Sequence, residues 1–224
     1  MMGTLYILAT PIGNLKDITL RAIDVLSSVD YVLCEDTRVT GRLLDHFEIK
    51  KPMVSFNEFN EGFKAQKVLD DLSAGSKIAI VSDSGTPLIS DPGYKLVREA
   101  IGKGIRVETI PGPSAVIAAL TLSGLPPDKF LFMGFLPKKE GRRMEILKNT
   151  ASVIRLMKVT VVIYESPYRV IKTLSEINDV FGDIDMVLCR ELTKMHEEVR
   201  RGNVSELINH FLTHEPRGEF VVLF

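Results

Sequence analysis

The chain has 224 residues, of which 45% are hydrophobic and 25% charged. These proportions are typical of a globular enzyme with one large or two small domains, which needs neither disulfides nor a structural metal. The formal net charge of −1 argues against a protein that coats bare nucleic acid, because such proteins are strongly basic.

The apolar runs have the length of strands and are too short to cross a bilayer. The sequence enters a strand pattern directly at its N-terminus, which predicts no secretory signal. Cys34 and Cys189 each end an apolar run, a position typical of buried reduced thiols rather than of a bridge or a metal pair. We therefore expect a cytoplasmic protein without a membrane partner.

Strand and helix patterns alternate in chain order. Strands are expected at residues 4–9, 31–34, 53–56, 77–81, 106–110, 129–135, 160–164, 186–189 and 219–224. Helices are expected at 18–27, with Asp17 as N-cap, and at 40–47, 61–72, 115–122, 168–181 and 205–213. Two more are expected, one from the loop that ends at residue 93 to about 103, and one from the basic loop at 136–141 to about 157. This order predicts an α/β fold with a mostly parallel first sheet. The linker candidate at 124–128 (GLPPD) predicts two domains, residues 1–123 and 124–224.

Four loops that follow strands are rich in glycine, proline and short polar residues: 10–14, 35–38, 82–93 and 111–115. In open α/β sheets, ligands bind at the carboxyl ends of the strands. A single loop of this kind would be explained as an ordinary tight turn. Four of them at strand ends favour a binding site.

Several ligand classes lack their sequence motifs. There is no phosphate-binding G-x-x-x-x-G-K-[ST], and TPIGN follows the first strand in place of G-x-G-x-x-G, which argues against a nicotinamide cofactor. No Cys/His cluster has metal spacing; His210 and His214 share a helical face, which is typical of a solvated surface. We predict no metal site.

Seven short motifs occur in a specific order along the chain. They are residues 10–15 (TPIGNL), 35–38 (EDTR), 81–93 (VSDSGTPLISDPG), 111–115 (PGPSA), 134–138 (GFLPK), 164–167 (YESP) and 190–194 (RELTK). Together they resemble the small-subunit ribosomal RNA methyltransferases of the tetrapyrrole methylase superfamily, over essentially the whole chain. The resemblance implies two α/β/α domains with a cofactor cleft between them, usually in a homodimer. It also implies S-adenosylmethionine as cofactor and methylation of a cytidine ribose 2′-hydroxyl in the decoding region of 16S rRNA.

Carried over position by position, the resemblance implies cofactor contacts in the first half and in the second. They are Pro11, Asp83, Gly85, Thr86, Ser114, Ala115, Tyr164, Leu192 and Gly218. The cofactor carries no phosphate, so short polar loops can bind its ammonium, carboxylate and adenine through backbone groups without a cationic cradle.

The sequence departs from its relatives at two positions and in its length. Ser84 stands where relatives commonly have Ala, a small change that fits the loop. Tyr168 stands where they commonly have His, so a mechanism with a histidine base there does not apply. Some relatives carry a further helical segment beyond the position of Phe224, and RNA contacts of that segment are missing or replaced here.

A ribose hydroxyl ionises far above neutral pH, so some group must accept its proton or stabilise the developing alkoxide. The charged loop residues available are Glu35, Asp36, Arg38, Glu165, Arg169, Arg190, Glu191 and Lys194. Our hypothesis assigns proton acceptance to Asp36, Glu191 or a Lys194 with a lowered pKa. Arg38 and Arg190 would orient carboxylates or a phosphate, and for each of these residues a structural ion pair is an equal alternative.

Contacts with RNA phosphates must come from local basic clusters because the net charge is near zero. The favoured cluster is the loop with Lys138, Lys139, Arg142 and Arg143. Lys50 and Lys51 are better explained as solvated charge, and Arg200 with Arg201 forms a third cluster. The expected partner is 16S rRNA or the small ribosomal subunit.

Two other functions stay open. A tetrapyrrole (precorrin-type) carbon methyltransferase would share the cofactor site, but the EDTR and RELTK motifs belong to the ribosomal RNA branch. A non-catalytic ribosome-binding factor would show a disrupted cofactor loop, whereas residues 82–93 are intact.

Overall fold

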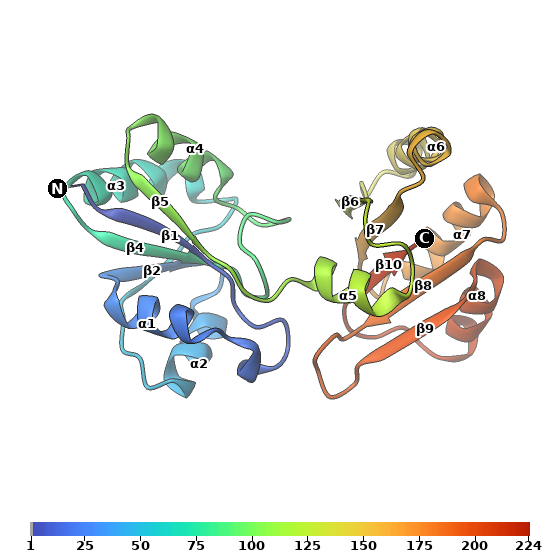
Figure 1. Ribbon diagram of the computed structural model, residues 1–224, viewed down its shortest axis with the longest axis horizontal. Coiled ribbons are helices and arrows are strands. Elements are labelled where there is room, and N and C mark those ends of the chain that lie inside the picture. Colours follow the sequence, from blue (N-terminus) through green and yellow to red (C-terminus); the bar gives the residue numbers. More distant parts are fainter. Residues whose placement is uncertain (1) are drawn as a thin grey trace. The chain divides into compact units, whose positions relative to one another are not determined.

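A computed structural model describes residues 2–224 (Figure 1). The chain divides into two compact units, Met1–Ser114 and Ala115–Phe224. No helix within residues 2–224 combines the length and the apolar character that crossing a membrane requires.

The first unit is built on a five-stranded sheet in the order β3-β2-β4-β1-β5, in which every pair is parallel. The strands are β1 (Thr4–Leu8), β2 (Tyr31–Cys34), β3 (Met53–Ser55), β4 (Lys77–Val81) and β5 (Arg106–Ile110). All five carboxyl ends therefore meet at one edge of the sheet, and the four loops named above follow β1, β2, β4 and β5 there. The prediction of a parallel first sheet is confirmed.

Helices cover both faces of this sheet, as Figure 1 shows. The helices are α1 (Leu20–Ser28), α2 (Thr37–His46), α3 (Glu61–Ser73) and α4 (Tyr94–Gly102), with a short 3-10 helix at Leu15–Asp17. Ile78 and Ile80 of β4 belong to the core under α3 and α4, whereas Ala79 and Val81 belong to the core under α1 and α2. Alternate residues thus enter opposite cores, which explains why β4 is apolar from Ile78 to Val81.

The second unit has a mixed sheet in the order β6-β7-β10-β8-β9. Its strands are β6 (Phe130–Phe135), β7 (Thr160–Glu165), β8 (Asp185–Arg190), β9 (Glu198–Asn203) and β10 (Phe220–Leu223). Only β6 and β7 pair in parallel; β10 and β9 pair antiparallel with their neighbours. Helices α6 (Glu140–Met157), α7 (Val170–Phe181) and α8 (Val204–Thr213) share the large core on one face, and α5 (Ala115–Ser123) contacts β8, β9 and β10.

Apart from shifts of up to three residues at the ends of elements, the structure differs from the sequence prediction in three places. The compact units divide after Ser114, and not at the proline-rich segment after residue 123, because α5 is apolar and packs on the second sheet. The N-cap of α1 is Thr19, whose hydroxyl accepts from the Ala22 N–H, and not Asp17, which lies in the 3-10 helix. The strand β9 was not predicted.

Candidate functional site

The loops after β1 and β4 are tied together by a short two-residue bridge. The Thr10 N–H donates to the Gly85 carbonyl at 2.9 Å, and the Gly85 N–H donates back to the Thr10 carbonyl at 3.1 Å. The buried Thr10 hydroxyl donates to the Ser82 carbonyl at 2.9 Å. The loop after β5 joins them, because the Thr86 hydroxyl donates to the Pro113 carbonyl at 3.1 Å. Three of the four predicted ligand loops therefore form one hydrogen-bonded rim.

Two glycines allow this rim to close. Gly85 has a φ of +88°, and a Cβ there would lie 3.2 Å from Ile12 Cγ2. A Cβ on Gly112 would lie 3.1 Å from the Cβ of Ala9. A left-handed backbone conformation and a close approach of two backbone segments both favour glycine. The predicted contacts Pro11, Asp83, Gly85, Thr86 and Ser114 all belong to this rim of the first unit, whereas Ala115 begins α5 of the second unit.

A cluster of carboxyl groups lies behind the rim, and Glu35 is its most perturbed member. Burial raises the pKa of Glu35 to about 7, and the nearby Asp91 and Asp83 carboxylates add to the rise. Burial also raises the pKa of Asp91, and the nearby Asp83 carboxylate adds to this rise, whereas the Ser82 hydroxyl and the Glu35 side chain act in the opposite direction. Burial likewise raises the pKa of Asp83, although its carboxylate accepts the Asp36 N–H at 3.1 Å. Glu35 was named only among the available charges; the sequence signal for it was its place one residue after β2.

Asp36 is the N-cap of α2 and an ion-pair partner of Arg38. Its carboxylate accepts from the Arg38 backbone N–H at 2.8 Å and from the guanidinium of the same residue. These bonds lower the pKa of Asp36 to about 2. The structure thus gives Asp36 a capping role and leaves it a weak base at neutral pH.

Glu191 and Lys194, the two other predicted proton acceptors, bind each other. Lys194 Nζ donates to Glu191 Oε1 and to Glu219 Oε2, both at 2.9 Å. Burial alone would lower the pKa of Lys194, but its bonds to Glu219 and Glu191 raise it. The prediction of a Lys194 with a lowered pKa is therefore wrong in this structure, because its ammonium form is the one that is hydrogen-bonded.

Gly218 is held against the same ion pair. A Cβ at Gly218, whose φ is +85°, would lie 2.5 Å from Cδ of Glu191. The Glu219 N–H donates to Glu191 Oε1 at 3.0 Å, so burial raises the pKa of Glu191 less than its partners lower it. Glu191 itself has a φ of +50°. The predicted cofactor residue Gly218 and two of the predicted catalytic residues, Glu191 and Lys194, thus form one local structure in the second unit.

The remaining predicted residues of the second unit lie in or next to its sheet. Tyr164 is the penultimate residue of β7, and its ring contacts those of Phe132 and Phe135 at centroid distances of 4.9 and 5.6 Å. Leu192 is buried just after β8. Tyr168, which replaces the histidine of relatives, is 96% exposed.

The basic loop divides into exposed and buried members. Lys138, Lys139 and Arg142 are exposed at the start of α6. Arg143 is 3% exposed and forms a bidentate ion pair with the buried Glu176. It also donates to the carbonyls of Pro137 and Lys138, at 2.9 and 3.0 Å. The prediction of Arg143 as an RNA contact is therefore wrong: its donors are occupied, and it positions the loop instead.

Three other charged candidates also have structural partners. Glu165 is buried and accepts from Arg169 and from the Thr173 hydroxyl. Arg190 donates to the Arg217 carbonyl at 2.6 Å and pairs with a glutamate of β9. For these residues the ion-pair alternative explains the side chains.

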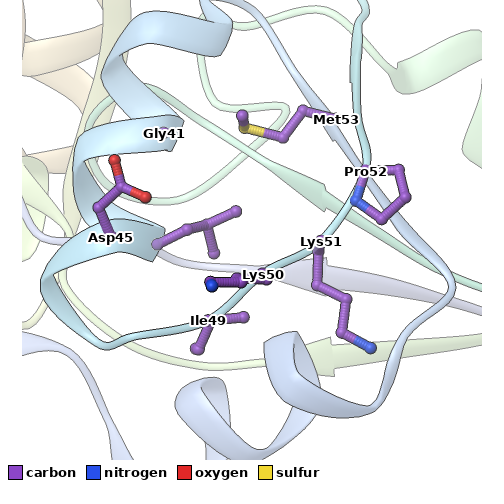
Figure 2. A pocket seen from close by; sticks show the side chains of 8 residues that line it. Gly41, Asp45, Ile49, Lys50, Lys51, Pro52 and Met53 are labelled. Carbon is purple, nitrogen blue, oxygen red and sulfur yellow. The ribbon is translucent and has the colours of Figure 1, made fainter.

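A surface hollow of about 350 Å³ lies away from these loops, between α2 and the segment that leads into β3. Figure 2 shows Asp45 of α2 on one side of it and Lys50 and Lys51 on the other. Lys51 donates to the Val29 carbonyl at the end of α1, at 2.7 Å. Because this segment precedes β3, the hollow is at the amino edge of the strand, where none of the predicted site residues lie.

Metal binding finds no support in the part of the chain that the structure describes. Residues 2–224 contain no group of three or more His, Cys, Asp or Glu side chains placed to hold a metal ion. The rings of His210 and His214 stack at 4.4 Å on α8. Both cysteines are buried free thiols, as expected.

An all-parallel α/β unit with glycine-bearing loops at its carboxyl edge, followed by a mixed α/β unit, defines the class of this protein. The chain belongs to the family described as Tetrapyrrole (Corrin/Porphyrin) Methylases, which matches residues 4–208.

Within this family, the similar curated proteins are ribosomal RNA enzymes. The chain is 48% identical to ribosomal RNA small subunit methyltransferase I of Thermotoga maritima, over 99% of this chain and 98% of that protein. It is 49% identical to the protein of the same name from Vibrio cholerae, over 98% of this chain and 76% of the other. A crystal structure of diphthine synthase superposes with a TM-score of 0.75 at 16% identity, over 98% and 89% of the two chains. That last likeness supports the fold alone.

Proposed function

We propose that the protein transfers a methyl group from S-adenosylmethionine to RNA of the small ribosomal subunit, at the 2′-hydroxyl of a cytidine in the decoding region of 16S rRNA. The observation that carries this proposal is the hydrogen-bonded rim of Thr10, Ser82, Gly85 and Thr86, in a chain 48% identical to an enzyme named for that substrate. We place the reaction in the cytoplasm, where the ribosomal subunit is found, with a homodimer as the working form.

The rim suits this cofactor in its donor chemistry. The Pro11 carbonyl and the backbone N–H and carbonyl of Thr86 can pair with an adenine, a ribose or an amino-acid group. Gly85 and Gly112, which carry no side chain, let the loops of the rim approach each other closely. The carboxyl groups of Asp83, Glu35 and Asp91 lie next to the same loops, an environment that suits a cation and not a phosphate. When bound, the cofactor supplies a methyl group on a positively charged sulfur.

The residues of the chain then bind and orient the acceptor and manage its proton. In our proposal the Glu35 and Asp91 pair accepts that proton, because a carboxyl with a pKa of about 7 is matched to proton transfer at neutral pH. Asp36 and Arg38 order the start of α2 beside it. Glu191 and Lys194 act in the second unit as a charged pair that holds the backbone around Gly218, and Tyr164 and Leu192 stay predicted cofactor contacts.

RNA binding is assigned to the exposed part of the basic loop. Lys138, Lys139 and Arg142 are free of the ion pair that buries Arg143. Recognition of an unstacked nucleotide suits a target whose sugar must be exposed for reaction.

The decisive test is transfer of labelled methyl from the cofactor to 16S rRNA, small subunits and a tetrapyrrole acceptor in parallel. We expect label in the RNA, mapped to a ribose oxygen of one cytidine. Label in the tetrapyrrole alone would make the protein a carbon methyltransferase. Cofactor binding without transfer to any acceptor would favour a non-catalytic ribosome-binding factor.

A further inference from the structure

A second cavity of the first unit, of about 260 Å³, opens beside the cofactor rim on the α2 side of the sheet. Its walls come from the loop after β1 and the start of the 3-10 helix that follows it, from the loop after β4 and from the middle of α2. None of its lining residues comes from the loop after β5, which closes the cofactor rim. The cavity therefore borders the rim and extends away from it.

The size of the cavity limits what it can hold. Pockets that enclose drug-sized ligands measure roughly 300–1,000 Å³. A volume of about 260 Å³ is below that range, so the cavity admits a single ring system rather than a nucleoside joined to an amino acid.

The chemistry of the walls suits a flat ring with a polar edge. Leu15, Val39 and Leu43 supply apolar surface. Thr40 is 2% exposed, and its Oγ1 has no hydrogen-bond partner of ordinary geometry within residues 2–224; the neighbouring Cys34 thiol is a weak one. A buried hydroxyl at a cavity wall that has no stronger partner than a thiol keeps the capacity to bond a polar group of a ligand.

Asp83 and Arg42 carry opposite charges and suit different groups of a ligand. Asp83 accepts the Asp36 N–H with Oδ1, and a carboxylate has about four lone-pair sites, so it keeps capacity to accept from a ligand amino group. Arg42 lines the cavity from the exposed side of α2, where a guanidinium is suited to a phosphate. A ring with an exocyclic amino group, attached to a phosphodiester, would satisfy both residues.

We propose that this cavity receives the cytosine base of the target nucleotide, with Asp83 accepting from its amino group and Arg42 contacting a flanking phosphate. A carboxylate that accepts from the cytosine N4 amino group is a known mode of base readout. Since Asp83 borders both the cavity and the cofactor rim, a base seated in the cavity brings its own ribose to the rim. This inference rests on the proposed function and adds the substrate-recognition site to it.

The first experiment measures base discrimination. The kcat/KM of methyl transfer is compared for two RNA substrates that differ only in cytidine or uridine at the target position, with wild-type protein and with Asp83→Asn. We expect the wild type to prefer cytidine by roughly tenfold or more, a preference that Asp83→Asn removes or reverses because an amide can donate to the uracil O4. Any loss of cofactor binding in this variant cancels in the ratio. An unchanged preference would overturn the proposal.

The second experiment separates RNA from cofactor. We expect Arg42→Ala to raise the RNA KM about fivefold or more and Thr40→Val to raise it severalfold, both without change in the cofactor Kd, which also verifies folding. The control is Arg98→Ala, an exposed arginine on α4 under the other face of the sheet. If Arg42→Ala weakens cofactor binding as much as RNA, or behaves like Arg98→Ala, the cavity is not the base site. Absence of methyl transfer to any RNA by the wild type would instead refute the proposed function itself.

Discussion

The raised pKa of Glu35 makes the stability of the protein depend on pH in a defined direction. The folded state holds the Glu35 proton up to about pH 7, whereas an unfolded glutamate releases it near its ordinary value of 4.5. The folded state therefore binds more protons in this window, and stability falls as the pH rises from about 4.5 to about 7. A shift of about 2.5 pKa units corresponds to at most about 3.4 kcal/mol, at 1.36 kcal/mol per unit. Because Glu35 is only half-buried, solvent screening reduces this to about 1–2 kcal/mol.

The variant Glu35→Gln removes the titrating group and keeps its shape. The free energy of unfolding is measured in urea between pH 5 and pH 8 for the variant and the wild type. We expect the difference, variant minus wild type, to increase by about 1–2 kcal/mol as the pH rises. Glu99→Gln, at an exposed position of α4, is the control and should follow the wild type. Parallel curves for Glu35→Gln and the wild type would refute the raised pKa of Glu35 in the folded state.

Three further perturbations test the second unit. Glu176→Ala leaves a buried arginine without its partner and should cost about 3–5 kcal/mol in urea unfolding, whereas Lys172→Ala, which removes an exposed pair, should cost no more than about 1 kcal/mol. Gly218→Ala should destabilise by about 1–3 kcal/mol, because its Cβ meets Glu191 at a positive φ; a thermal shift of zero would contradict this. Lys139→Ala should reduce the slope of log K for single-stranded RNA against log salt by about 0.7, and an unchanged slope would exclude a phosphate contact.

The fold of the first unit could be predicted from the sequence because its strands are separated by helices and most of them are rich in apolar residues, above all β2 and β4. The antiparallel half of the second sheet was harder. The sequence of β9, Glu198–Asn203, is EVRRGN, with one apolar residue and no alternation. It forms a strand because its backbone pairs with β8 at the edge of the sheet, a long-range contact that local pattern does not contain.

The loops of the candidate site could be predicted from the sequence, but the ion-pair and hydrogen-bond partners of its charged side chains could not. Glycine and proline at strand ends indicated the loops of Thr10, Gly85 and Thr86, which the structure joins by hydrogen bonds, because those residue types mark the turns themselves. Arg143 and Arg142 are adjacent in sequence, and only the packing of α6 against α7 sends one to Glu176 and the other to solvent. Charge is visible in a sequence, but its neutralisation by a distant residue is not.

The same distinction decides which group is suited to take a proton. Asp36 and Glu191 have lowered pKa values because cations and N–H groups stabilise their ionised forms, and Lys194 has a raised pKa because two carboxylates stabilise its ammonium. A group held in its charged form by partners is a poor proton acceptor at neutral pH, whatever its position in a motif. Glu35 differs because burial and the nearby carboxylates disfavour its ionised form, which raises its pKa to about 7. Proton acceptance by Glu35 requires turnover to rise with pH up to about 7 and Glu35→Gln to lose that rise; a wild-type profile that is flat from pH 5 to 8 would return the role to an already ionised group.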